Sequence, residues 1–252
     1  MKLRYLLYVT FGITALLSGC QGKDGDPGPA GGGLTGNVYG FVNAYDDAGS
    51  LLSKSGVTVT LEGATPAVTT TSDANGRYEF QGLKAGTYNF TYNRSGLGVF
   101  RRDGVAHVGG DQATFLGVTS LTEPSNTRAA VVSAASNQQL PGIAVVQVGL
   151  ANPNLPGNSL LRFVVLVGST PDVTVANGQW NGTVYGTSSG QYGVSLSRAS
   201  LNALGFATGS TAYVAAYGIS AYTVYYLDPI TGRYILPGLN PGSSTAVSFI
   251  VP

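Results

Sequence analysis

The chain of 252 residues contains few of the side chains that support disulfide bonding, metal binding or proton transfer. It has one cysteine and one histidine, so no disulfide can form within the chain and no histidine pair can bind a metal or relay a proton. Only 10% of the residues are charged and the formal net charge is +1, which leaves no electrostatic footprint for nucleic acid. We therefore expect no nucleic-acid partner, no cofactor or metal, and a fold held together by apolar burial.

Residues that favour helices are scarce beside those that favour strands and turns. The chain contains 37 Gly, 12 Pro and 15 Tyr, and Val and Thr are abundant, a composition typical of an all-β protein. Its length suits two domains of about 100–125 residues each. We predict two tandem antiparallel β-sandwiches.

The N-terminal segment has the charge pattern of an export signal. Lys2 and Arg4 precede an uncharged stretch from Tyr5 to Leu17, and this stretch is shorter than the roughly 20 residues that cross a bilayer as a helix. We interpret residues 1–19 as a secretory signal peptide.

The signal ends in Leu17, Ser18, Gly19 and Cys20, an aliphatic residue, two small residues and a cysteine. This sequence resembles the lipobox of bacterial lipoproteins. The resemblance implies that the Cys20 thiolate takes a diacylglyceryl group and that cleavage before Cys20 frees an amine for another acyl chain. Two or more acyl chains anchor a protein stably, so the expected partner is the membrane. The alternative is an ordinary cleaved signal followed by an incidental cysteine.

Residues 20–34 have the composition of a tether. Glycine recurs at every third position from Gly22 to Gly31, but three triplets are too few for a collagen triple helix, so we predict a flexible, extended segment. An Asp at the position directly after the lipidated cysteine would resemble an inner-membrane retention signal. This chain has Gln21 at that position. We therefore expect the outer membrane, and leave surface or periplasmic orientation open.

Residues 35–121 alternate short apolar strands with turn residues, the rhythm of a sandwich. Val57, Val59 and Leu61 should share one face, and the strand at 67–71 should form a hairpin with 77–80 through Asp73 and Gly76. The strings GVTVTL, TTSDANGRYEF and LKAGTY resemble the carboxypeptidase regulatory-like domain, a transthyretin-like sandwich. The resemblance implies a non-catalytic module and supplies no active-site residues.

Residues 122–127 are polar and contain a proline, so we interpret them as a linker to a second domain at 128–252. There the apolar run at 160–167 predicts a central strand, and Ser200 is expected to cap a short helix. The strand order and Tyr213, at the position of a corner tyrosine, resemble a fibronectin type III-like sandwich. A hairpin is expected between residues 222–227 and 233–236.

No catalytic constellation stands out. A lone histidine on a strand, His107, is most often structural, and Ser195 lacks the second glycine of a nucleophile elbow. Acidic side chains at the turns near Asp46 and Asp73 favour turn capping, with a calcium site as the alternative. We predict that the protein is not an enzyme.

Tyrosine is the residue class most suggestive of a contact surface. Adjacent residues of a strand point to opposite faces, so at least one of Tyr225 and Tyr226 should point outward. The predicted partner contacts are Tyr222, Tyr225, Tyr226 and Tyr234. We expect a structural or adhesive envelope module whose partner is an envelope protein; the alternative is a glycan-binding lipoprotein that serves polysaccharide uptake through this tyrosine-rich face.

Overall fold

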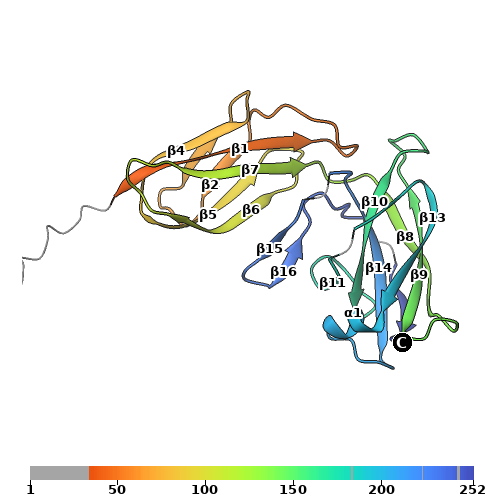
Figure 1. Ribbon diagram of the computed structural model, residues 1–252. Helices are drawn as coiled ribbons and strands as arrows, with labels where there is room; N and C mark the ends of the chain where they lie inside the picture. Colours follow the sequence, from red (N-terminus) through yellow and green to blue (C-terminus); the bar gives the residue numbers. More distant parts are fainter. Residues whose placement is uncertain (1–33, 183, 223, 243–244) are drawn as a thin grey trace, which may run out of the picture. The chain divides into compact units, whose positions relative to one another are not determined.

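The computed structural model describes residues 34–252 except 183, 223, 243 and 244. The predicted signal peptide, the lipobox with Cys20 and the tether up to residue 33 lie outside the described residues. Within the described part, the chain is almost entirely β-structure (Figure 1), which confirms the predicted fold class. No helix there has the length and hydrophobicity of a membrane span.

The first group of strands forms two sheets that enclose one core. One sheet has the order β4-β1-β7 and the other the order β3-β2-β5-β6. Their bounds are β1 Thr35–Tyr45, β2 Thr58–Leu61, β3 Val68–Thr71, β4 Arg77–Lys84, β5 Gly86–Asn93, β6 Phe100–His107 and β7 Thr114–Thr122. The predicted apolar face of the second strand is confirmed, because Val57, Val59 and Leu61 are all buried in this core.

The predicted hairpin between residues 67–71 and 77–80 is wrong. Asp73 does form the turn, since its Oδ1 accepts from the N–H groups of Asn75 and Arg77 at 2.9 and 2.8 Å. However, β3 pairs with β2 in one sheet and β4 pairs with β1 in the other. The turn at Gly76 lies against β1, where the N–H of Val42 donates to the Gly76 carbonyl. Local turn residues predict the reversal but do not specify which strand is the pairing partner.

One strand pair departs from the antiparallel arrangement predicted for the sandwich. β1 and β7 pair in parallel, from Val38 opposite Thr114 to Tyr45 opposite Thr122. Every other strand pair among the described residues with a recorded direction is antiparallel.

The second group of strands also forms two sheets around a core. One has the order β13-β9-β8 and the other β11-β10-β14-β17, with β12 also paired to β10. The bounds are β8 Arg128–Ser136, β9 Ile143–Ala151, β10 Leu161–Gly168, β11 Gln179–Trp180, β12 Tyr185–Thr187, β13 Gly190–Ser197, α1 Arg198–Ala203, β14 Thr211–Ile219, β15 Tyr226–Asp228, β16 Arg233–Ile235 and β17 Val247–Ile250.

The sheet that contains β10 is covered on both faces. Phe163 and Val165 point into the main core, whereas Val164 and Leu166 belong to a second apolar cluster with Trp180 and residues of the segment after β14. A strand with two buried faces reads as a continuous apolar run rather than an alternating one. This arrangement explains the apolar run at 160–167 and confirms that it is a central strand.

The short helix α1 begins three residues earlier than predicted. The N-cap is Ser197, whose hydroxyl accepts from the Ser200 N–H at 3.1 Å while its own backbone stays extended. Ser200 instead lies inside the first turn, and its hydroxyl lies 2.8 Å from that of Ser197. Two serines three residues apart carry the same capping chemistry, and the end of β13 decides which one caps the helix.

Candidate functional site

The tyrosine-rich segment forms a short hairpin from β15 and β16, with Tyr226 opposite Ile235 and Asp228 opposite Arg233. The strands are shorter than the ranges 222–227 and 233–236 that the sequence predicts. Asp228 stabilises the connecting turn, since Oδ1 accepts from the Ile230 N–H at 3.0 Å and Oδ2 accepts from the Thr231 hydroxyl at 2.8 Å. The Ile230 N–H bond is the main reason that the pKa of Asp228 lies below its usual value.

Adjacent tyrosines of this hairpin point to different neighbours. Tyr226 packs edge-on against Phe100 of β6, with ring centroids 5.2 Å apart. Tyr225 packs edge-on against Trp180 of β11 at 5.0 Å and keeps half of its surface exposed. The hairpin therefore contacts β6 through one tyrosine and β11 through the other, and Tyr225 is the more exposed of the two.

Trp180, Tyr225 and Tyr234 form an aromatic triad. Every pair of rings in it meets edge to face, with centroid distances of 5.0, 5.2 and 5.5 Å. This T-shaped geometry is the favoured one for aromatic pairs. Trp180 is 8% exposed, whereas Tyr225 and Tyr234 are 50% and 45% exposed. The buried tryptophan thus holds two tyrosines that still face solvent.

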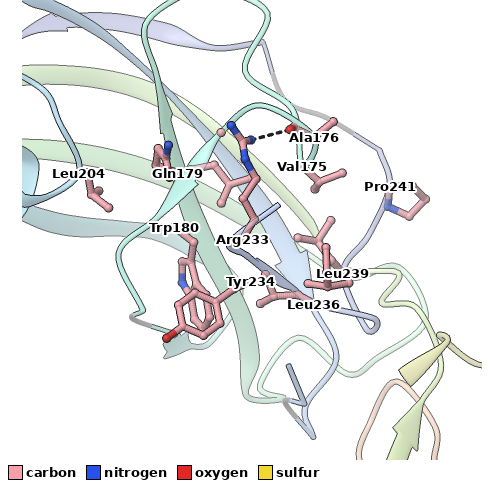
Figure 2. Close-up of a pocket in the computed structure, with 14 residues that line it drawn as sticks. Val175, Ala176, Gln179, Trp180, Leu204, Arg233, Tyr234, Leu236, Leu239 and Pro241 are labelled. Atoms are coloured by element: carbon pink, nitrogen blue, oxygen red, sulfur yellow. Dashed lines mark hydrogen bonds between the residues drawn. The ribbon is translucent and has the colours of Figure 1, made fainter. Parts of the chain in front are cut away.

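A pocket of about 500 Å³ lies beside this triad, between β16 and the outer face of the β10 sheet. Figure 2 shows Trp180 and Tyr234 lying against each other at the pocket, and Arg233 extending toward Ala176. Most of the wall is apolar, with Leu166, Leu236 and Leu239 among the lining residues. A largely apolar cavity of this size with a few polar groups is typical of a small-ligand site.

Two polar side chains line the pocket, Gln179 and Arg233. The Nη1 group of Arg233 donates to the Ala176 carbonyl at 2.5 Å, which fixes the guanidinium at the wall. The ion pairs formed by described residues are Arg77 with Glu79 and Arg101 with Asp103. Arg233 thus contributes a positive charge to the pocket that no carboxylate in the described chain pairs with.

The remaining two predicted contacts have packing partners. Tyr222 is stacked on Tyr45 of β1, with centroids 3.9 Å apart and planes within 9° of parallel, although it remains 41% exposed. Tyr226 is half-buried against Phe100, and burial raises its pKa. The structure therefore places Tyr234 in the pocket wall, with Tyr225 packed against it but not lining the pocket, and places Tyr222 and Tyr226 elsewhere.

The residues predicted as a linker form a buried polar junction. Thr122, Ser125 and Thr127 are each less than 5% exposed, and the Ser125 N–H donates to the Gly238 carbonyl at 3.1 Å. Asp47 is also buried here, and its Oδ2 accepts from the backbone N–H of Asn126 at 2.9 Å. This segment is thus a packed part of the fold.

The first part of the chain, residues 37–119, matches a family model for the carboxypeptidase regulatory-like domain. This confirms the resemblance predicted from the turn and strand sequences of that part. The match covers about a third of the chain, so the lipoprotein class and the fibronectin type III-like second domain stay predictions.

Within the carboxypeptidase regulatory-like domain, His107 is a buried structural residue. Its Nδ1 lies 2.7 Å from the Thr114 hydroxyl and its Nε2 lies 3.1 Å from the Leu83 carbonyl. Because a carbonyl can only accept, Nε2 donates to it, and both ring nitrogens have a partner within the fold. Among the described residues, no group of three or more His, Cys, Asp or Glu side chains could hold a metal ion.

The chain is similar to several solved structures at low sequence identity and low TM-score. A protein from Bacteroides uniformis, provisionally described as carbohydrate-binding, is 14% identical with a TM-score of 0.32, over 86% of this chain and all of that one. A DUF3823 family protein from Bacteroides ovatus is 10% identical with a TM-score of 0.29, over 86% and 100%. The type II cohesin–X-dockerin complex from Acetivibrio cellulolyticus is 19% identical with a TM-score of 0.30, over 35% of this chain.

This chain spans 58% of the matched chain in the cohesin–X-dockerin complex. At these identities and TM-scores the likenesses carry no argument about the fold or the ligands of this chain. No curated protein matches the chain.

Gln179 and Arg233 are not among the site residues predicted from the sequence. Arg233 could have been noticed because cationic side chains are rare in this part of the chain. After residue 128 the cations of the described chain are Arg162, Arg198 and Arg233. Arg233 also follows directly on the turn of the tyrosine hairpin. Nothing local to Gln179 distinguishes it, since its position depends on the pairing of Val167 with Gln179 between β10 and β11.

Proposed function

We propose that this protein is a non-enzymatic adhesive lipoprotein of the bacterial envelope that binds glycans through the pocket beside Trp180, Tyr225 and Tyr234. The observation that carries the proposal is the combination of two half-exposed tyrosines with a pocket of about 500 Å³. A module that only spaced other parts apart would not require such a pocket. This observation favours glycan binding over a purely structural role.

Exposed tyrosine rings suit sugar binding for an electrostatic reason. The face of an aromatic ring is negative and attracts weakly positive hydrogens, and the C–H groups on one side of a pyranose ring supply them. Polar groups around the ring then select among sugars through hydrogen bonds. Tyr234 supplies such a ring at the pocket wall, Tyr225 packs against it, and Gln179 supplies polar atoms.

The anchoring part of the proposal depends on Cys20. Acyl chains on Cys20 would hold the folded residues at the outer membrane, with the glycine-rich tether between them. The test is Cys20→Ala, which should move the protein from the membrane fraction to the soluble fraction of lysed cells. A Cys20→Ala protein that stays with the membrane would overturn the anchor. Protease treatment of intact cells then tests surface exposure.

Glycan binding is tested with the full chain purified in detergent and a panel of bacterial and plant polysaccharides. We expect binding to at least one polysaccharide, and a loss of about tenfold or more in affinity when Tyr225 and Tyr234 are both changed to Ala, since each stacked ring contributes about 1 kcal/mol or more. Trp180 should be left unchanged because it is buried.

The matched control for that double variant is Phe115→Ala. Phe115 is 54% exposed and lies on the other group of strands, stacked on Tyr39 at 5.1 Å. Binding that survives in the tyrosine double variant but is lost in Phe115→Ala would move the site to the β1–β7 face. No binding to any polysaccharide by the folded wild-type protein would overturn the glycan proposal.

A structural role as a spacer is the second candidate, and the buried junction around Asp47 and Asn152 favours it. Hydrogen bonds that connect the two groups of strands resist bending between them. A spacer of this kind needs no ligand, so the polysaccharide panel distinguishes the two functions.

A further inference from the structure

The charge of the pocket narrows the class of glycan that it would bind. Among the described residues that line it, Arg233 is charged and none is acidic. Gln179 is the other polar side chain there, and it is neutral. The pocket therefore presents one positive charge over an apolar and aromatic wall.

The fold keeps that charge without a carboxylate partner. Asp228 lies opposite Arg233 in the hairpin register, but both of its oxygens accept hydrogen bonds from the turn, from the Ile230 N–H and the Thr231 hydroxyl. The recorded partner of Arg233 is the neutral carbonyl of Ala176, which orients the guanidinium and does not neutralise it.

An arginine held in this way is suited to a carboxylate. Its planar guanidinium carries five N–H donors in a fork that matches two carboxylate oxygens, and hydrogen bonds between two charged groups are about twice as strong as neutral ones. The hydrogen bond from Nη1 to Ala176 uses one of these donors. The aromatic wall beside it provides the face on which the sugar ring itself could stack.

We propose that the ligand of this pocket is a polysaccharide that contains uronic acid, with its carboxylate on Arg233 and its ring against the wall that includes Tyr234. This inference rests on the proposed glycan-binding function and adds the charge of the ligand. A neutral glycan would leave the arginine without a charged partner, and an acidic residue added to the wall would remove the preference.

The test compares the acidic form of a polymer with its neutral ester, for two polymers. The full chain in detergent is titrated with polygalacturonate and with the same polymer after methyl esterification, and with alginate and its neutral ester as a second pair. The two members of each pair share their sugar rings and differ in the charge of the carboxyl group. We expect binding to the acidic form to be about tenfold or more tighter at low salt and the difference to shrink as salt is raised.

Arg233→Gln should reduce that preference to about twofold or less. The control is Arg128→Gln, since Arg128 is an exposed cation on β8 outside the pocket and its loss should leave the preference intact. Equal affinity for acid and ester would overturn the uronate inference and leave glycan binding standing. A preference that persists in Arg233→Gln would overturn the assignment to this pocket. If neither the acidic nor the esterified form of either polymer binds, the inference is also overturned.

Discussion

The ring of Tyr226 meets the ring of Phe100 edge to face, at a centroid distance of 5.2 Å and an interplanar angle of 69°. Phe100 opens β6 of the first strand group, whereas Tyr226 opens β15 of the hairpin that borders the pocket. This contact supports the hairpin from the side opposite the aromatic triad. The adjacent residues Tyr225 and Tyr226 therefore both hold the hairpin in place, through Trp180 and Phe100 respectively.

Tyr226→Ala should loosen the hairpin, because it removes a ring from this contact at a cost of about 1 kcal/mol. Hydrogen exchange measured by mass spectrometry should show faster exchange in residues 226–235. Tyr226→Phe keeps the ring and should retain the wild-type rate. Unchanged exchange in Tyr226→Ala would show that the contact does not support the hairpin.

Asp47→Ala should destabilise the junction between the two strand groups. The Asp47 Oδ2 atom accepts from the Asn126 N–H and from the Asn152 side-chain amide, both at 2.9 Å. Loss of the acceptor removes a partner of the buried Asn152 amide and of the Asn126 N–H, at a cost of about 1–3 kcal/mol. Urea unfolding measures this cost, and Asp111→Ala at an exposed turn is the control that should cost little. Equal midpoints for the two variants would contradict a stabilising role of Asp47.

Gly218→Ala should be among the most damaging single-methyl additions. A Cβ atom at Gly218 would lie 1.9 Å from the Thr127 carbonyl oxygen, and backbone would have to move. Such overpacking costs about 1–3 kcal/mol or more. The matched control is Gly157→Ala, where nothing lies within 4 Å of the added atom. Thermal unfolding should separate the two variants by several degrees, and a smaller effect for Gly218→Ala than for Gly157→Ala would contradict the close packing at Thr127.

Thermal stability should fall at alkaline pH. The hydroxyls of Tyr78 and Tyr92 are buried and lie 2.7 Å apart, and burial raises the pKa of Tyr78 in the folded state. The unfolded chain releases this proton above a pH of about 10, whereas the folded state holds it. Stability is therefore full below that pH and is lost as the pH rises. Melting temperatures between pH 8 and 11.5 should show this decline.

The control for this decline is Tyr78→Phe, which removes the titrating hydroxyl and should flatten the dependence on pH, although it lowers stability at pH 8. A decline of the same steepness in Tyr78→Phe would assign the effect to other tyrosines, such as Tyr226, whose pKa burial also raises.

Ser197→Ala should destabilise the protein by about 1 kcal/mol, the usual cost of losing an N-cap hydroxyl. Its hydroxyl accepts from the Ser200 N–H, whereas the Ser200 hydroxyl only meets that of Ser197. Ser200→Ala should therefore cost less than Ser197→Ala in urea unfolding. The reverse order would place the cap at Ser200, as the sequence alone suggests.

Much of the local structure follows from the sequence because its causes are local. Alternation of Val57, Val59 and Leu61 predicts one buried face, and the continuous apolar run of β10 predicts burial on both faces. Side-chain direction in a strand repeats every two residues, so a short segment carries this information by itself. The turn at Asp73 and Gly76 is local for the same reason.

The candidate site depends on contacts between residues distant in the sequence. Four tyrosines were predicted as contacts, but only the fold separates Tyr225 and Tyr234, which share Trp180, from Tyr222 and Tyr226, which pack on Tyr45 and Phe100. Arg233 is oriented at the pocket by a hydrogen bond to the carbonyl of Ala176, which lies 57 positions away in the sequence. No local pattern encodes such distances.

The sequence by itself determined the all-β class and the buried faces of individual strands, because these depend on residue spacing over a few positions. The resemblance of its strings to the carboxypeptidase regulatory-like domain agrees with the family model that matches residues 37–119. Only the tertiary structure decided that β3 and β4 enter different sheets, that Thr122, Ser125 and Thr127 of the polar segment are buried, and that Arg233 and Tyr234 line one pocket. Strand pairing and side-chain packing are set by competition among many distant partners. That competition is resolved when the whole chain packs.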